Sequence, residues 1–446
     1  MHVVMVGAGY VGLVSGACFA EFGASVICFD KDKEKISDLN KGKIPIYEPG
    51  LENLVNKNMS ARRLSFSNNL DEVSNADVVF IAVGTPSRRG DGDADLTYVF
   101  EATKNVAKHL IPKNNLTLVV TKSTVPIGTS AEVEKIIKKE RPDLTCGVHF
   151  DVASNPEFLR EGSAIEDFMR PDRVICGVNS TTAKEILERL YRPINLRETP
   201  IIFTDFQTSE ISKYAANAFL ATKITFINEV SDLCEKTNAN VQDVAKSIGL
   251  DGRIGSKFLH PGPGFGGSCF PKDTRAYVTM SQKYNCKSRL ISSVVESNDN
   301  RKLMMVKKII KALDNNIKDK KIAILGITFK PNTDDLREAP SLIIIPELIK
   351  RGCLVKVYDP AGMPAGKKVE EFKKVIWSNS AKDCYEGADG LVILTEWNEF
   401  RGIDPQELKK SLIKPVVIDL RNIFRLEVMK KNNFKYFSIG RPELKA

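Results

Sequence analysis

Residues 3–12 read VVMVGAGYVG, a short apolar run that enters a glycine-rich turn. Residues 13–21 then have the composition of a helix, and a second apolar run, ASVICFD at 24–30, ends on an acidic residue. A buried strand, a GxGxxG turn, a helix and an acid closing the next strand predict a dinucleotide-binding βαβ unit.

Each residue of this motif has a physical task in such a unit. Gly7 permits the tight turn, Gly9 lets the backbone approach a pyrophosphate at the helix N-terminus, and Gly12 allows the helix to pack closely on the strand. Asp30 is placed to accept hydrogen bonds from the adenosine ribose and would repel a 2′-phosphate, which favours NAD over NADP. Lys35 is a further candidate for the ribose, with a solvated surface lysine as the alternative.

The strand-and-helix pattern continues along the chain and then repeats. Apolar runs at 76–86, 116–126 and 173–178 alternate with helical stretches, and a second set lies at 320–330, 354–360, 389–397 and 415–420. Alternation of this kind predicts parallel sheets covered by helices. We expect an α/β protein with two Rossmann-like, doubly wound parallel-sheet domains. The expected division is an NAD-binding domain at 1–200, a central helical region at 201–300 and a second nucleotide-binding-type domain at 301–446, which lacks the GxGxxG motif and need not hold the same ligand.

The central region differs from both halves. Residues 206–238 contain no Gly or Pro, and their apolar residues recur at helical spacing. Some 30 helical residues span roughly 45 Å, longer than an ordinary domain helix. We expect one long helix that joins the two domains and forms a homodimer seam, with a spine inside a single chain as the alternative.

Composition argues against several classes of function. The 446 residues are 42% apolar and 27% charged, with a formal net charge of +9 spread along the chain. This suits a globular protein with an anionic small-molecule partner better than a nucleic-acid-binding protein. The uncharged stretch 1–20 lacks a basic start and is interrupted by glycines, so we expect no signal peptide or membrane span.

Cysteine and histidine usage argues against a metal site. Nine cysteines occur without CxxC pairs, and four histidines occur without metal-ligand spacing, so we expect no disulfide framework, no metal and a cytoplasmic location. The Asp-rich loop 87–95 lacks the full EF-hand pattern and is expected to be solvated.

The most informative segment is GFGGSCFPKD at 264–273. It places Cys269 in a glycine-rich loop, with Lys272 and Asp273 three and four residues later. Glycines let a substrate approach the backbone, and a nearby ammonium favours the thiolate. A dehydrogenase uses a cysteine when its product is an acid, because the aldehyde is held as a thiohemiacetal and oxidised to a thioester.

These motifs, with VGTP, KSTVP, NPEFLREG, EISKYAANAFLATKITFINEV and GITFKPNTDDLRE, occur in the order seen in the UDP-glucose/GDP-mannose dehydrogenase family. The chain resembles this family from residue 1 to about 425, and its DGRIGSKFL segment at 251–259 resembles the UDP-glucose members. The resemblance implies a four-electron oxidation of the C6 alcohol of UDP-glucose to UDP-glucuronate, with two molecules of NAD.

The resemblance also implies catalytic roles. Cys269 would be the nucleophile, while Lys213 and Asn217, four residues apart on one face of the long helix, would stabilise an oxyanion. Thr124 and Glu161 resemble positions near the nicotinamide and the hydrolytic water. Asp273 is the other candidate for assisting water, or for positioning Lys213, so the identity of the general base stays open.

Contacts are expected along both halves of the chain. The glycine motif and the resemblance together give as cofactor contacts Gly7, Gly9, Tyr10, Val11, Gly12, Asp30, Lys35, Thr85, Thr124, Glu161, Lys272 and Arg337. The resemblance gives as substrate contacts Glu157, Phe158, Leu159, Arg160, Glu161, Lys213, Asn217, Arg253, Phe258, Leu259, His260, Pro261, Gly262, Gly266 and Lys330.

Other functions remain as alternatives. One is a 6-dehydrogenase acting on GDP-mannose or a UDP-N-acetylhexosamine, and another is a two-electron dehydrogenase of the 3-hydroxyacid type, which would have no use for Cys269. The last is a non-catalytic regulator that binds NAD or a nucleotide sugar.

Overall fold

The computed structural model describes residues 1–88, 92–195 and 198–445. These form two compact units, the first comprising Met1–Ala216 with Thr279–Tyr284 and the second Asn217–Val278 with Asn285–Ala446. The division passes through two helices, α8 (Phe206–Thr237) and α10 (Phe270–Lys283).

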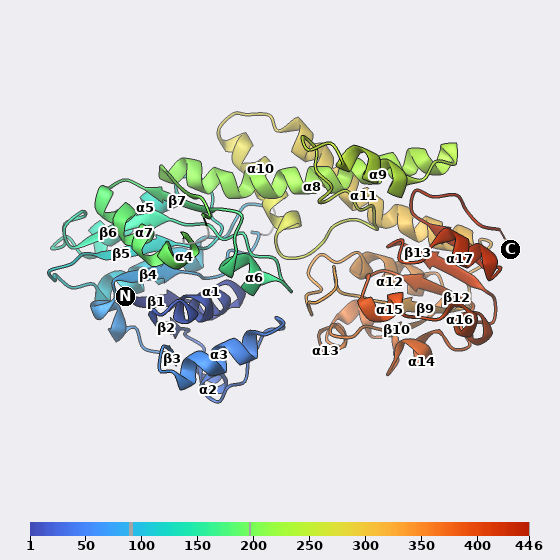
Figure 1. Cartoon of the computed structure of the whole chain (residues 1–446), viewed down its shortest axis with the longest axis horizontal. Helices are drawn as coiled ribbons and strands as arrows, with labels where there is room; N and C mark the ends of the chain where they lie inside the picture. Colours follow the sequence, from blue (N-terminus) through green and yellow to red (C-terminus); the bar gives the residue numbers. More distant parts are fainter. Residues whose placement is uncertain (89–91, 196–197, 446) are drawn as a thin grey trace. The chain divides into compact units, whose positions relative to one another are not determined.

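The first unit is built around a sheet with the strand order β3-β2-β1-β4-β5-β6-β7-β8 (Figure 1). Its strands are β1 (His2–Val6), β2 (Ser25–Phe29), β3 (Leu64–Ser67), β4 (Val78–Ile81), β5 (Thr117–Thr121), β6 (Phe150–Ser154), β7 (Val174–Val178) and β8 (Ile201–Thr204). Its helices are α1 (Tyr10–Glu21), α2 (Lys33–Asn40), α3 (Leu51–Ser60), α4 (Thr97–His109), α5 (Thr129–Glu140), α6 (Ala164–Met169) and α7 (Thr181–Asn195), with a 3₁₀ turn at Asp71–Asn75.

Strand β1 shows why this sheet is buried on both faces. Val3 and Met5 join one apolar core with α1, α3 and α7, while Val4 and Val6 join another with α4 and α5. Successive side chains of a strand point to opposite faces, so a strand covered on both sides is apolar throughout. The pairing of β6 with β7 is antiparallel, a departure from the all-parallel pattern that the apolar runs alone predict.

The second unit repeats the Rossmann strand order of 3-2-1-4-5-6, here β11-β10-β9-β12-β13-β14, and all its pairings are parallel. Its strands are β9 (Lys321–Leu325), β10 (Leu354–Tyr358), β11 (Ile376–Trp377), β12 (Gly390–Ile393), β13 (Val416–Asp419) and β14 (Lys435–Ser438). Its further helices are α9 (Val241–Gly249), α11 (Arg289–Ala312), α12 (Ser341–Lys350), α13 (Met363–Gly366), α14 (Ala381–Tyr385), α15 (Asn398–Arg401), α16 (Pro405–Ser411) and α17 (Leu426–Lys431), with a 3₁₀ turn at Glu370–Phe372.

The expected fold class is therefore confirmed, with two Rossmann-like domains and a continuous 32-residue helix, α8, that contributes residues to both (Figure 1). Helix α1 begins at Tyr10 rather than at Leu13. Residues 89–91 of the Asp-rich loop lie outside the described residues. Asp93 of the same loop departs from the expected solvated state, because it is buried and pairs with Lys283.

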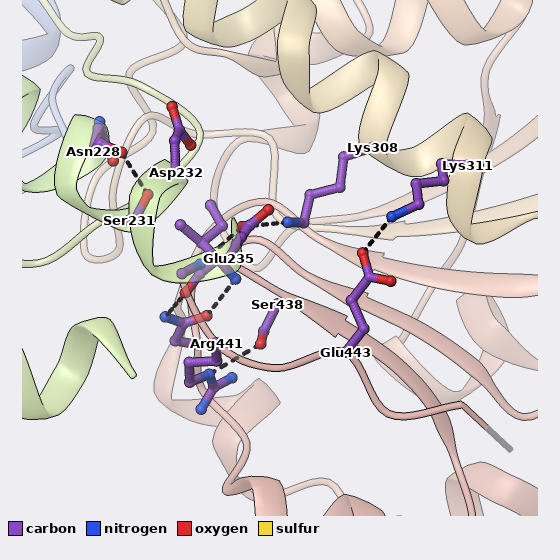
Figure 2. A network of polar contacts seen from close by, with 12 residues as sticks. Asn228, Ser231, Asp232, Glu235, Lys308, Lys311, Ser438, Arg441 and Glu443 are labelled. Atoms are coloured by element: carbon purple, nitrogen blue, oxygen red, sulfur yellow. Dashed lines mark hydrogen bonds and ion pairs between the residues drawn. The ribbon is translucent and has the colours of Figure 1, made fainter. Parts of the chain in front are cut away.

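In the second unit, polar contacts attach the C-terminal segment to α8 and α11 (Figure 2). Glu235 of α8 accepts hydrogen bonds from Lys308 of α11 at 2.5 Å and from the backbone N–H of Gly440 at 2.9 Å. Lys311 of α11 pairs with Glu443 at 2.7 Å. The C-terminal segment of the chain thus contacts both helices through Gly440 and Glu443.

Across the described ranges, the helices are too short or too polar to traverse a bilayer.

Candidate active site

The glycine turn after β1 is built as the sequence predicts. Gly7 has φ +110°, and a Cβ on Gly12 would lie 1.8 Å from the Gly7 carbonyl oxygen. No L-amino-acid side chain fits at either position without displacing backbone, since a positive φ and a 1.8 Å approach both require glycine. The two glycines therefore set how closely α1 packs on β1.

The N-terminus of α1 has the form that a phosphate group needs. Gly9 is its exposed N-cap residue, no described side chain caps the helix, and a Cβ at Gly9 would meet nothing within 4 Å. The first backbone N–H groups of a helix lack intrahelical partners and carry a partial positive charge. An uncapped and approachable helix end fits the pyrophosphate of a dinucleotide.

Asp30 lies at the end of β2, beside this turn. Its carboxylate accepts hydrogen bonds from the Ala8 N–H at 3.1 Å, the Asp32 N–H at 3.1 Å and Lys35 Nζ at 2.8 Å. Burial by itself would raise the pKa of Asp30, but the hydrogen bonds from Lys35 and these amides outweigh it, so the pKa is lowered. An ionised acceptor is therefore in place, and Lys35 contacts Asp30 directly.

Tyr10 connects this turn to a more distant loop. Its hydroxyl donates to Glu48, whose two carboxylate oxygens also accept from the N–H groups of Gly162 and Ala164 at 2.6 and 2.7 Å. Burial, followed by the hydrogen bond to Glu48, raises the pKa of Tyr10. The dinucleotide turn and the segment that follows Glu161 are thereby held by one carboxylate.

Two loops at the carboxyl edge of the sheet meet through Thr85 and Thr124. The Thr85 hydroxyl donates to the Thr124 carbonyl at 2.9 Å, and the neighbouring Ser123 hydroxyl donates to the Val83 carbonyl at 2.6 Å. Ligands of open α/β sheets bind outside this edge, and both threonines lie there.

The segment after β6 carries a buried ion pair. Lys213 of α8 donates to Glu157 at 3.2 Å, and their side chains are 3% and 7% exposed. Glu157 also accepts from the Leu159 N–H at 2.5 Å, and Lys213 lies 5.1 Å from the Phe158 ring centroid. Arg160 pairs instead with Asp167, at 2.5 Å, while Glu161 is half-buried. Glu157 and Phe158 of this segment therefore hold the ammonium group of Lys213 in place.

A second buried lysine, Lys122, contacts Asn155 at the start of the segment that carries Glu157. It donates to the Asn155 side-chain oxygen at 2.9 Å and to the Tyr191 hydroxyl at 3.3 Å, while Tyr191 itself donates to Asn155 at 2.6 Å. The Asn155 amide group donates to the Ile175 carbonyl at 2.8 Å. Since Asn155 lies two residues before Glu157, this network fixes the start of the loop that orients Lys213.

In the second unit, Cys269 immediately precedes α10. The Asp273 N–H donates to the Cys269 carbonyl at 2.8 Å, which makes Cys269 the N-cap residue, and the Ser268 hydroxyl lies 3.5 Å from its sulfur. The partial positive charge of a helix N-terminus favours a thiolate. Cys269 is therefore placed directly at the N-terminus of α10.

Asp273 lies one turn further along α10 and is 1% exposed. Its carboxylate accepts from the Asn217 side chain at 2.6 Å and from Lys272. Asn217 belongs to α8 and donates this hydrogen bond through its side-chain nitrogen. Cys269, Asp273 and Asn217 thus form one cluster within the second unit.

The loop at 258–262 is held mainly through its backbone. Gly262 donates its N–H to the Asn228 side chain at 2.8 Å, and its carbonyl accepts from Arg301 at 3.1 Å. A Cβ on Gly262 would lie 3.1 Å from a terminal nitrogen of Arg421. Of the other expected contacts in this loop, Phe258 has φ +66°, Leu259 and Pro261 are buried, and His260 is exposed.

Four other expected contacts in this unit, Gly266, Lys330, Arg337 and Arg253, have contacts of their own. Gly266 packs so closely on the Glu338 carbonyl that a Cβ would lie 2.6 Å from its oxygen. Lys330 lies 5.5 Å from the centroid of the neighbouring Phe329 ring. Arg337 pairs with Asp335, and Arg253, 90% exposed, pairs with Asp251 and extends from the unit.

The acid after the second strand of the second Rossmann domain is more deeply buried than Asp30 of the first. Asp359, which follows β10 as Asp30 follows β2, is 1% exposed and accepts from the backbone of Ile327, Ala361 and Gly362 and from Trp397. Both carboxylate oxygens of Asp359 accept hydrogen bonds from within the domain, so this acid is not available to a ribose hydroxyl. The two domains are therefore suited to different ligands.

Several positioning residues were missed by sequence reasoning, namely Glu48, Lys122, Asn155, Asn228, Arg301 and Arg421. Their partners are distant in sequence and are mostly backbone groups, so no spacing rule finds them. A weak signal existed for Arg301 and Lys302, two charged residues on what becomes a buried helix face.

Comparison with known proteins agrees with this geometry. Residues 1–195 match the NAD binding domain of the UDP-glucose/GDP-mannose dehydrogenase family, residues 207–300 its central domain and residues 323–426 its UDP binding domain. The chain is 54% identical to a UDP-glucose 6-dehydrogenase of Rhizobium meliloti, covering 99% of this chain and 100% of that one. It is 45% identical to a UDP-glucose 6-dehydrogenase of Bacillus subtilis, covering 100% and 94%.

Solved structures give the same result. A UDP-glucose dehydrogenase from Pyrobaculum islandicum superposes with a TM-score of 0.89 at 35% identity, covering 100% of this chain and 98% of that one. A UDP-D-ManNAc dehydrogenase from Pyrococcus horikoshii superposes with a TM-score of 0.86 at 27% identity, covering 99% of each chain. The resemblance drawn from the motifs is confirmed, and this chain is an NAD-dependent dehydrogenase that belongs to the UDP-glucose/GDP-mannose dehydrogenase family.

Proposed function

We propose that this protein oxidises the C6 alcohol of UDP-glucose to the carboxylate of UDP-glucuronate, through covalent intermediates on Cys269. The observation that carries the proposal is the position of Cys269 at the N-terminus of α10, one turn before the buried and doubly hydrogen-bonded Asp273. The names of the full-length relatives support UDP-glucose as the substrate.

The bonding changes balance as two oxidations and one hydrolysis. The C6 alcohol first loses a hydride and a proton and becomes an aldehyde. The Cys269 thiolate adds to the aldehyde carbon, and the resulting thiohemiacetal loses a second hydride to give a thioester. Water then adds to the thioester carbon, the carbon–sulfur bond breaks, and the carboxylate and the thiolate are released together with the two protons of the water. Bound NAD supplies the hydride acceptor for each oxidation.

The surrounding side chains divide the remaining tasks. Lys213 and Asn217, one helical turn apart on α8, are proposed to stabilise the oxyanion of the tetrahedral intermediates. The Glu157 carboxylate and the Phe158 ring hold the Lys213 ammonium in a fixed position. Asp273 and Glu161 are the two carboxylates proposed to assist water, and Thr124 is assigned to the nicotinamide side.

We assign NAD binding to residues 1–200, the catalytic loop to 201–300 and UDP-sugar binding to 301–446. The dinucleotide contacts proposed are the glycine turn from Gly7 to Gly12 with Asp30 and Lys35, together with Thr85, Lys272 and Arg337. The substrate contacts proposed are residues 157–161 and 258–262 with Arg253, Gly266 and Lys330. Arg421 joins the second group because it lies against Gly262.

The same helix is proposed to form a homodimer seam. Phe219, Phe226 and Leu233 of α8 are 65%, 51% and 65% exposed. Their spacing of seven residues places them along one face of the helix, the spacing at which two long helices pack on each other. A second copy of the chain would cover this apolar row. The nine cysteines, all thiols, suit a cytoplasmic enzyme.

The decisive experiment counts NADH formed per UDP-glucose consumed when the sugar nucleotide is limiting. Two NADH and a UDP-glucuronate product are expected, and Cys269→Ser is expected to fall by at least about 10²-fold in kcat because no thioester forms. One NADH with a released aldehyde would refute the role of Cys269. Turnover with GDP-mannose or a UDP-N-acetylhexosamine, but not UDP-glucose, would refute the substrate. Binding of NAD and UDP-glucose without any turnover would indicate a non-catalytic regulator.

A further inference from the structure

We propose that Asn298 of α11 is a positioning residue for Cys269, acting through the backbone of the glycine-rich loop. This inference rests on the proposed nucleophilic role of Cys269. Asn298 lies outside the motifs that identify the site, and its side chain is 5% exposed.

The primary observation is a paired contact between one side chain and one loop residue. The Phe265 N–H donates to the Asn298 side-chain oxygen at 2.8 Å, and the Asn298 amide nitrogen donates to the Phe265 carbonyl at 3.1 Å. The amide thus binds both polar groups of a single peptide residue, as a neighbouring strand would. Of the 20 side chains, only the primary amides of Asn and Gln offer a neutral donor and acceptor in this arrangement, and Gln is longer by one carbon.

The loop is shaped to accept this contact. Gly264 has φ +111°, and a Cβ there would lie 3.0 Å from the Asn298 side-chain oxygen. The Phe265 side chain packs with Val294, one turn before Asn298 on the same face of α11, and with Ala221 of α8. Backbone and side chain of Phe265 are therefore held by the same helix face.

Gly266 and Gly267 of the loop contact a different segment, residues 337–338, which precede α12. The Gly267 N–H donates to the Arg337 carbonyl at 2.8 Å, and Gly266 lies against the Glu338 carbonyl. Four residues after Phe265 the chain reaches Cys269 and enters α10. Asn298 holds the backbone of Phe265, and the Arg337 carbonyl holds the backbone of Gly267. Loss of Asn298 therefore releases the backbone hydrogen bonds of Phe265, four residues before Cys269.

The test measures the thiol as well as turnover. In Asn298→Ala we expect kcat for UDP-glucose oxidation to fall by about 10²-fold, the effect of displacing a reacting group by about 1 Å. We also expect the pH midpoint of Cys269 alkylation by iodoacetamide to rise by about one unit, because the sulfur is no longer held at the N-terminus of α10. The label is followed in the Cys269 peptide by mass spectrometry, since the exposed Cys286 also reacts.

The matched control is Asn300→Ala, an exposed residue of the same helix, which is expected to keep the kcat and the alkylation profile of the wild type. If Asn298 only stabilises the fold, Asn298→Ala will lower the melting temperature and leave both readouts unchanged, and the proposal is overturned. Should Asn298→Ala fail to fold, Asn298→Asp carries the test, because it keeps the acceptor for the Phe265 N–H and loses the donor. A wild-type kcat and alkylation midpoint in Asn298→Asp would equally overturn the proposal.

The two proposals fail in distinguishable ways. Absence of NADH formation by the wild type would refute the proposed oxidation, while the alkylation midpoints would still show whether Asn298 positions Cys269. Wild-type turnover with an unchanged Asn298→Ala variant would refute only the inference about Asn298.

Discussion

The buried Lys122 gives a prediction whose sign and size follow from its surroundings. The side chain is 3% exposed, with Phe80 and Phe168 around its nitrogen and Asn155 and Tyr191 as hydrogen-bond acceptors. Burial lowers the pKa of Lys122 to about 8, against the nearby negative charge of Glu157, which opposes the shift. In the unfolded chain the lysine has an ordinary pKa, near 10.4.

The effect on folding depends on which state binds more protons. Below pH 8 both states are protonated, and the folded state bears the full cost of burying the ammonium. Between pH 8 and 10.4 the folded state releases its proton while the unfolded state keeps it, so stability rises with pH. A difference of about 2.4 pKa units corresponds to about 3 kcal/mol, of which about 2 kcal/mol is recovered by pH 10.

We therefore expect the free energy of unfolding of the wild type, minus that of Lys122→Met, to increase by about 2 kcal/mol from pH 7 to pH 10. Urea unfolding followed by far-UV circular dichroism measures both proteins. Trp377 and Trp397 both lie in the second unit, so a transition without a tryptophan signal reports the first. Lys135→Met, an exposed lysine of α5, is the control and should show no such increase. A wild-type-minus-variant difference that is constant with pH, or that falls, would refute the reasoning.

Two further predictions concern the dinucleotide turn and the seam. Gly12→Ala is expected to lower the melting temperature and abolish NAD binding, because its Cβ would lie 1.8 Å from the Gly7 carbonyl. Gly9→Ala should keep the melting temperature, since its Cβ meets nothing, yet weaken NAD binding about tenfold by obstructing the approach to the α1 amides. Calorimetric titration measures NAD binding by the two variants, and thermal unfolding measures their melting temperatures. Equal losses of melting temperature in Gly12→Ala and Gly9→Ala would contradict the argument. Phe226→Asp is expected to convert a dimer to a monomer in analytical ultracentrifugation, and a variant that stays dimeric would place the seam elsewhere.

Much of the site was accessible from the sequence because its chemistry is local. Gly7, Gly9 and Gly12 act through backbone geometry within one turn, and the interval between Cys269 and Asp273 is one helical turn whatever the rest of the chain does. The extent of α8 was also anticipated, since apolar residues recur at helical spacing within residues 206–238, which contain no Gly or Pro. Strand and helix alternation gave the fold class for the same reason, since both periodicities are properties of short segments.

The sequence by itself thus determined the two Rossmann domains, the dinucleotide turn and the candidate nucleophile. Only the tertiary structure decided that Glu48 joins Tyr10 to the Gly162 backbone, that Lys122 supports Asn155, and that Asn298 holds Phe265. The tertiary structure also decided that β7 pairs antiparallel with β6 and that Asp359 accepts hydrogen bonds from its own domain. Each of these depends on contacts between residues tens of positions apart, which are created by chain packing and leave no local periodicity in the sequence.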